Sequence, residues 1–282
     1  MGKIKQQGIR NSVFLYLGII LGYINIVILF PRFFDQEVFG LTRSFIAFAN
    51  VMAILAQLGF SNITIKYFPY FRSEDQRHHG FLFLVLAVPL IGLIVVMGLF
   101  WLLQPYILEV FGKDSQLFAN NYYWLFPLTL AILYFEALAS YARALFHSVV
   151  AVGLKEVGIR LGVSAAIFAA SLLALDTSSF LAVFTLAYLL PVLVLLGYIA
   201  YLGQASLRPD FRLLDRSMRS TLTSYGFFTL AHRLSLVLNK RVDILMLTAL
   251  ADLKQVAIYT IAFYIGNTIM VPSRGLIQIS SP

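Results

Sequence analysis

Apolar residues in this 282-residue chain gather into long blocks that short polar segments separate. A helix needs roughly 20 residues to cross a ~30 Å hydrocarbon layer, and the blocks have about that length. Helices are expected because lipid offers no partner to backbone N–H and C=O groups, and the sequence lacks the short alternating segments of a membrane β-barrel. The pattern predicts an all-α polytopic membrane protein with about eight transmembrane helices. The blocks cover about residues 12–30, 41–65, 81–103, 122–146, 157–175, 180–202 and 224–250, and the eighth begins near 256.

Composition agrees with this class. Hydrophobic residues make up 60% of the chain and charged residues 12%, against about a quarter charged in soluble domains. So few charges cannot cover a water-facing surface. Residues 1–10 lack the apolar core and cleavage site of a signal peptide, so the first block is expected to be a retained helix.

The basic residues predict an orientation, because lysine and arginine favour cytoplasmic loops. The net charge is +8, and its distribution matters more than its sum, so no nucleic-acid partner is expected. Alternate loops are rich and poor in basic residues, which predicts eight spans with both ends in the cytoplasm. The rich side holds Lys3, Lys5, Arg10, Lys66, Arg72, Arg77, Arg143, Lys155, Arg208, Arg212, Arg216 and Arg219, and the other side holds Arg32, Lys113 and Lys254.

The longest basic connector, residues 204–223, divides the chain. It separates a six-helix membrane lobe, residues 1–203, from the start of a second lobe, residues 224–282. Apolar residues among its arginines suit an amphipathic segment on an anionic leaflet, and an ordinary charged loop is an equal alternative. A weak internal match at a shift of 218 residues, such as Asn25 with Asp243, favours two parallel related halves, as in many transporters.

The seventh block carries the most charge. Arg233, Lys240 and Asp243 fall on one helical stripe, with Asn239 one turn from Asp243 and Arg241 about 100° away. Charges inside a membrane cost several kcal/mol unless they face a wet cavity or a partner. The stripe is therefore expected to face the bundle interior as an anion-binding or ion-coupling surface. The alternative is a structural pair between Lys240 and Asp243.

Other polar residues in the blocks have structural alternatives. Glu136 lies in mid-block with Arg143 one heptad away on the same face. Arg43 is expected to extend toward the outer interface. Asn25 and Asn50 suit helix–helix hydrogen bonds as well as ligand contacts. Glu156 and Arg160 are expected to form a structural i,i+4 pair.

No catalytic or metal-binding pattern is found in the sequence. The chain lacks cysteine, a glycine-rich phosphate loop with lysine, a Ser/His/Asp set and an HExxH motif. The histidines, His78, His79, His147 and His232, show no metal-ligand spacing, and His78 and His79 are expected in a solvated loop. We therefore expect no enzyme activity, no cofactor and no metal.

Two segments resemble a known family. Residues 8–12 (GIRNS), a long helix and then residues 33–41 (FFDQEVFGL) are similar to the opening of bacterial polysaccharide flippases. These belong to the multidrug/oligosaccharidyl-lipid/polysaccharide exporter superfamily. Residues 242–245 and 256–259 resume the pattern in the second half, although Ile258 stands where glycine is usual.

The resemblance implies two six-helix lobes around a central cavity in the bacterial inner membrane. It implies that an undecaprenyl-diphosphate-linked oligosaccharide moves from the cytoplasmic to the outer leaflet by alternating access, in polysaccharide or O-antigen biosynthesis. Its partners would be that substrate, membrane lipids and other polysaccharide assembly proteins. Asp243 would couple transport to an ion or proton gradient. The candidate cavity residues are Arg233, Lys240, Arg241, Asn239, Asn25 and Glu136.

The family has about twelve helices, so this chain is expected to hold one full lobe and two helices of the second, and not to transport alone. One alternative is a multidrug or cation antiporter of the same superfamily, although a basic cavity argues against cationic drugs. Another is a membrane-embedded acyl- or glycosyltransferase that uses Glu136 or His147. A structural scaffold would leave the charges of the seventh block unexplained.

Overall fold

The computed structural model describes residues 3–73, 78–112, 115–208, 210 and 215–269, with side chains from Gln6 onward. All regular elements in these ranges are helical, which confirms the all-α prediction. Several residues used for orientation, Arg77, Lys113 and Arg212 with the side chains of Lys3 and Lys5, lie outside the described part.

The first two predicted blocks form five elements. The first block is one continuous rod of α1 (Lys3–Tyr23), a π-helical turn η1 (Ile24–Leu29) and α2 (Phe30–Phe33). The second block was expected to be one helix, and this is wrong: α3 (Gln36–Gln57) and α4 (Phe60–Phe71) are separated at Leu58 and Gly59. Gly59 has φ of 74°, and a Cβ there would lie 2.2 Å from the Gly226 carbonyl oxygen. Close approach of another helix therefore requires glycine at this break.

The remaining blocks also form helices, some of them interrupted. Ser115, Asp176 and Asp215 cap α7, α11 and α12 by accepting backbone N–H groups. The elements are η2 (His78–Gly80), α5 (Phe81–Leu102), α6 (Gln104–Phe111), α7 (Gln116–Asn121), η3 (Tyr122–Trp124), α8 (Leu125–Ala144), α9 (Ser148–Gly153), a π-helical η4 (Leu154–Gly158), α10 (Ile159–Leu172), α11 (Thr177–Tyr201), α12 (Arg216–Leu250) and α13 (Leu253–Ile269).

Five helical stretches within the described residues are long and apolar enough to cross a membrane. The chain is therefore a multi-pass membrane protein. The predicted number of eight stays a prediction, because η4 and α10 carry Lys155, Glu156 and Arg160, α12 carries charges in mid-helix and α13 is described over 17 residues. The five stretches are Gln6–Phe33, Gln36–Gln57, His78–Leu102, Gln116–Ala144 and Thr177–Tyr201.

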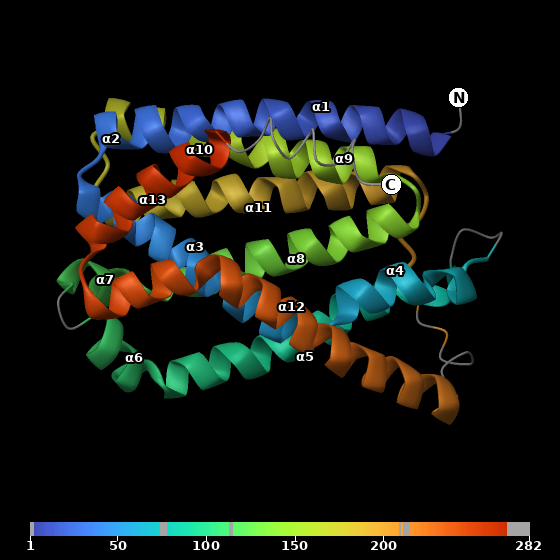
Figure 1. Ribbon diagram of the computed structural model, residues 1–282. Helices are drawn as coiled ribbons and strands as arrows, with labels where there is room; N and C mark the ends of the chain where they lie inside the picture. The colour runs from blue at the N-terminus through green and yellow to red at the C-terminus, as the bar shows by residue number, and fades with distance from the viewer. Residues whose placement is uncertain (1–2, 74–77, 113–114, 209, 211–214, 270–282) are drawn as a thin grey trace.

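The helices run back and forth between two ends of the bundle (Figure 1). At the N-terminal end, where α1 begins, Gln7 Nε2 donates to the Phe146 carbonyl at 2.6 Å. At the opposite end, the Tyr123 hydroxyl bonds Ser178 Oγ at 2.6 Å, and Lys254 pairs with Glu37 at 3.2 Å. This alternation agrees with the loop order predicted from basic residues. A cytoplasmic N-terminus stays a prediction.

The described residues of the predicted connector (204–208, 210 and 215–223) lie at the N-terminal end of the bundle (Figure 1). Its residues 209 and 211–214 are outside the described ranges, and α12 begins at Arg216, before the predicted start of the second lobe at 224. The Gln204 carbonyl accepts the Tyr141 hydroxyl at 3.1 Å, which fixes the beginning of the connector to α8. The division into two lobes stays a prediction.

Helix α3 is the centre of the bundle and packs against α5, α8, α12 and α13. Ser44 Oγ and Thr248 Oγ1 share a buried hydrogen bond of 2.7 Å between α3 and α12. A Cβ at Gly40 would lie 1.8 Å from the Leu253 carbonyl oxygen, so small residues let α13 approach α3 closely. These contacts fix α12 and α13 beside the first helices and set the walls of a cavity.

Candidate functional site

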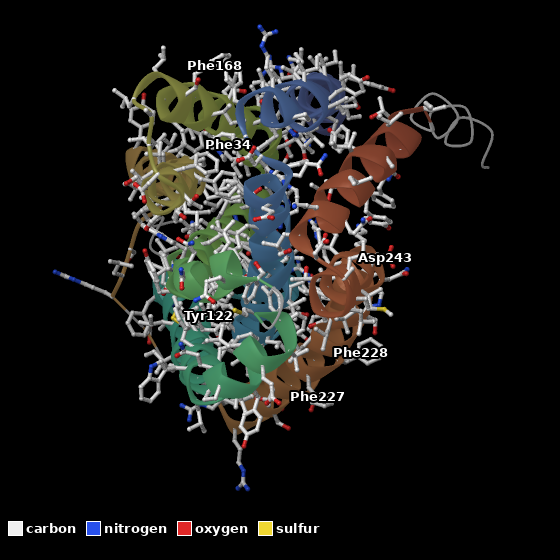
Figure 2. The ribbon with its side chains drawn as sticks, turned by 90° about the vertical axis from the view of Figure 1, so that its left-hand side faces the viewer. Phe34, Tyr122, Phe168, Phe227, Phe228 and Asp243 are labelled. Carbon is white, nitrogen blue, oxygen red and sulfur yellow. The ribbon has the colours of Figure 1, made fainter. Side chains whose placement is uncertain are left out.

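A cavity of about 750 Å³ lies among α1, η1, α3, α8, η4, α10, α11, α12 and α13. In the end-on view of Figure 2, α13 slants between α1 and α12 on one side of α3. Both π-helical turns border the cavity, η1 through Asn25 and Ile26 and η4 through Lys155 and Glu156. Such turns often occur at functional sites. Its ionisable and amide lining residues are Asn25, Arg43, Asn50, Glu136, Lys155, Glu156, Arg160, Asn239, Lys240, Arg241 and Asn267, with Tyr188, Tyr259 and Tyr264.

The predicted stripe of α12 is divided in the structure. Asn239, Lys240 and Arg241 line the cavity, although Arg241 was expected to point away from the stripe. Arg233 does not line it, and Asp243 is exposed on the outer side of α12 (Figure 2). The cavity face of this helix therefore centres on Arg241 and Ile244.

Asp243 contacts α13 and not Lys240. Its Oδ2 accepts a hydrogen bond of 2.5 Å from the hydroxyl of Tyr259, which lines the cavity. Lys240 forms no ion pair within the described part of the chain, so the alternative of a structural Lys240–Asp243 pair is wrong. Lys240 is therefore an unneutralised cation on the cavity wall.

Glu136 joins three helical segments. It accepts a hydrogen bond from Lys155 Nζ of η4, and its Oε2 lies 3.8 Å from Arg233 Nη2 of α12. Arg233 Nη1 also donates to Gln57 Oε1 of α3 at 3.0 Å. Arg143, one heptad from Glu136 on the same face of α8, forms no ion pair with it among the described residues. Sequence spacing could not predict the contact between Lys155 and Glu136, because it depends on how α8 packs against η4.

The expected structural pair of Glu156 and Arg160 is confirmed, with 2.5 Å between Oε2 and Nη1. Asn25 Nδ2 donates to the Arg160 carbonyl at 2.8 Å, and Ser164 Oγ donates to Asn25 Oδ1 at 2.6 Å. Asn25 thus makes the helix–helix hydrogen bonds that are expected if its role is structural. It also lines the cavity. Asn50 donates within α3 to the Ile46 carbonyl at 2.6 Å.

Arg43 lies in the cavity wall, so its expected place at the outer interface is wrong. Its Cζ lies 5.0 Å from the centre of the Phe30 ring and 5.1 Å from that of Phe39. These cation–π contacts hold the guanidinium where no carboxylate neutralises it within the described residues.

The lining is therefore basic. Lys155 and Arg160 are paired with Glu136 and Glu156, whereas Arg43, Lys240 and Arg241 have no carboxylate partner in the described part of the chain. Electrostatic attraction strengthens away from bulk water, so such a surface suits an anionic ligand. A group of three or more potential metal ligands is not found among the described residues.

The histidines lie outside this cavity. His78 was expected in a solvated loop, and this is wrong: it is buried against Phe68, with ring centres 5.0 Å apart. His147 Nδ1 lies 2.8 Å from the Tyr198 hydroxyl, and His232 is exposed on α12.

Comparison with known proteins identifies the family. The chain belongs to the polysaccharide biosynthesis protein family, whose model matches residues 5–281. The resemblance to polysaccharide flippases of the exporter superfamily is thereby confirmed. Membership supports a polysaccharide-related transport function in general. The chain shows no match to a curated protein or to a solved structure.

Proposed function

We propose that this member of the polysaccharide biosynthesis family moves an undecaprenyl-diphosphate-linked oligosaccharide from the cytoplasmic to the outer leaflet by alternating access. The setting would be polysaccharide or O-antigen assembly in a bacterial inner membrane, with a cytoplasmic N-terminus. Family membership and the membrane-spanning helices support a polysaccharide-related lipid substrate. The direction, the diphosphate and the residues that hold it are our inference.

The observation that carries the proposal is the set of cavity cations without a carboxylate partner in the described residues. Arg43 comes from α3, and Lys240 and Arg241 come from α12. A diphosphate presents several anionic oxygens, and arginine can donate two parallel hydrogen bonds to such a group. Two helices that belong to different predicted lobes would then hold one ligand group between them.

Neutral polar groups of the same cavity suit sugar hydroxyls. Asn25, Asn239 and Tyr188 line it, and amide and phenol groups both donate and accept hydrogen bonds. Glu136 is also on the wall, where two cations neutralise it. We propose that it orders Lys155 and Arg233 and that the substrate phosphates bind elsewhere.

We keep Asp243 as the candidate for ion or proton coupling. It lies outside the cavity, and its hydrogen bond to Tyr259 connects it to the cavity wall. A change in the charge of Asp243 would alter that bond and so the packing of α13 on α12.

Two alternatives are less well supported. A multidrug or cation antiporter would have to bind a cation among the unneutralised Arg43, Lys240 and Arg241. A membrane-embedded acyl- or glycosyltransferase would need its acid and base together, and Glu136 and His147 line different cavities.

The experiment uses the full-length protein in cells that lack their own copy. Replacing Lys240 and Arg241 together by alanine should lower surface glycan roughly tenfold or more, because each lost charge-assisted hydrogen bond weakens binding. Lipid-linked precursor should accumulate. Arg216→Ala, an exposed residue at the first position of the same helix, is the control. Normal glycan at a normal protein level would remove Lys240 and Arg241 from the site.

A further inference from the structure

A second cavity, of about 700 Å³, lies at the N-terminal end of the bundle. Its lining residues come from the end of α4, from η2, from the turn between α8 and α9 and from the end of α11. These segments lie at the same end of the bundle (Figure 1). It shares no lining residue with the central cavity, so the proposed substrate site does not account for it. Its lining residues are Pro69, Arg72, Ser73, His78, Leu145, His147, Leu202 and Gln204.

The polar lining of this cavity can carry positive charge. Arg72 carries a permanent positive charge, and His78 and His147 add ring nitrogens that can donate hydrogen bonds. The described lining residues include no carboxylate. The Arg72 guanidinium lies over the ring of Phe146 at 5.9 Å, which holds it beside the cavity.

Internal hydrogen bonds orient the other donors. His78 Nδ1 accepts the backbone N–H of Ser73 at 3.2 Å, so its Nε2 carries the proton and donates to Gln204 Oε1. The amide NH₂ of Gln204 is then able to donate to a ligand. When the Tyr198 hydroxyl donates to His147 Nδ1, at 2.8 Å, His147 Nε2 likewise carries a hydrogen. Arg72, His147 and Gln204 thus supply N–H donors around one cavity, as an oxyanion requires.

Exposed aromatic residues lie on the segments that surround this cavity. Tyr70, Phe146 and Tyr201 are 67%, 59% and 86% exposed on the segments that surround it. Tyrosine side chains such as those of Tyr70 and Tyr201 gather at the level of the lipid headgroups. Basic pockets between transmembrane helices at this level bind anionic headgroups. A lipid phosphate is therefore the oxyanion that is always within reach of these donors.

We propose that Arg72, His147 and Gln204 bind the phosphate of a membrane phospholipid headgroup in this cavity. The ligand chemistry is a phosphate oxyanion, for which soluble phosphate is the other source. The bound headgroup would tie α4, the α8–α9 turn and the end of α11 together where the connector to α12 begins.

The test is a binding titration of the purified full-length protein with two probes, dihexanoyl phosphatidylglycerol and inorganic phosphate. The lipid probe should bind, and Arg72→Gln with His147→Gln should weaken it about tenfold or more. Arg10→Gln, an exposed arginine at the same end, should bind as the wild type does. Arg72→Lys keeps the charge and should lose less than the glutamine variant.

Three results would overturn the proposal. The first is wild-type affinity in the folded double variant, with an unchanged melting temperature. The second is failure of both probes to bind the wild type. Tighter binding of inorganic phosphate than of the lipid probe would overturn the headgroup assignment and leave a site for soluble phosphate.

Discussion

Arg233 of α12 and Glu136 of α8 form an ion pair, with 3.8 Å between Nη2 and Oε2, while the same guanidinium donates to Gln57 of α3. Both Arg233 and Gln57 lie nearer the N-terminal end of the bundle than the cavity residues of their helices. The contact therefore joins α12 to the earlier helices at one boundary of the cavity. Alternating access, as proposed, would require it to open.

Glu136→Gln should destabilise the protein, because it leaves Lys155 and Arg233 without their shared counter-charge. Loss of one partner of a partly buried ion pair costs about 2 kcal/mol, so the thermal unfolding midpoint in detergent should fall. Glu109→Gln, at an exposed position of α6, is the matched control. Equal midpoints for the two variants would show that the Glu136 contacts contribute nothing to stability.

Gly59→Ala should disrupt the packing of α12 across the break between α3 and α4. The new Cβ would lie 2.2 Å from the Gly226 carbonyl oxygen, and φ is 74°. Overpacking and the left-handed backbone together cost about 2–4 kcal/mol. The yield of monodisperse protein after size-exclusion chromatography measures this. Gly98→Ala, with open space around its Cβ, should behave as the wild type, and equal loss in both would refute the contact argument.

The two ends of the bundle should differ in access from outside the cell. The native chain has no cysteine, so single cysteines can be introduced directly. Leu173→Cys, on an exposed residue at the opposite end, should react with a membrane-impermeant maleimide added to intact cells. Leu207→Cys, exposed at the N-terminal end, should react only after lysis. The reverse pattern would invert the proposed orientation.

Asp243→Asn should make transport insensitive to the ion or proton gradient, because the variant cannot gain or lose charge. Tyr259→Phe removes the hydroxyl that donates to Asp243 at 2.5 Å and should alter the same dependence to a smaller degree. Uptake by proteoliposomes with and without an imposed pH gradient would measure both. Wild-type gradient dependence in Asp243→Asn would exclude the residue from coupling.

Hydropathy predicted the helical class and the five membrane-spanning stretches because the cost of unpaired backbone groups in lipid permits few alternatives. It missed the break at Leu58 and Gly59, since the apolar run continues through it; the close approach of Gly226 to Gly59 depends on tertiary packing. The π-helical turns η1 and η4 likewise leave no mark in the apolar pattern.

Of the contacts at the site, only those within a single helix could be predicted from the sequence. Spacing of i,i+4 located the pair of Glu156 and Arg160 correctly. Spacing could not bring Lys155 to Glu136 or place Arg43 in the cavity wall, because these positions depend on how separate helices cross. The side of α12 that faces the cavity also depends on its packing against α3, which turns Arg241 inward and Asp243 outward.

If the unneutralised cavity cations hold a lipid-linked diphosphate, as we propose, the purified protein must bind that group. The full-length protein should bind a polyprenyl diphosphate, and Lys240→Ala with Arg241→Ala should weaken that binding by about 3–6 kcal/mol, since two hydrogen bonds to charged groups are lost. Affinity for the matching polyprenyl alcohol should not change. Equal affinity of the wild type and the folded double variant for the diphosphate would show that Lys240 and Arg241 do not hold it.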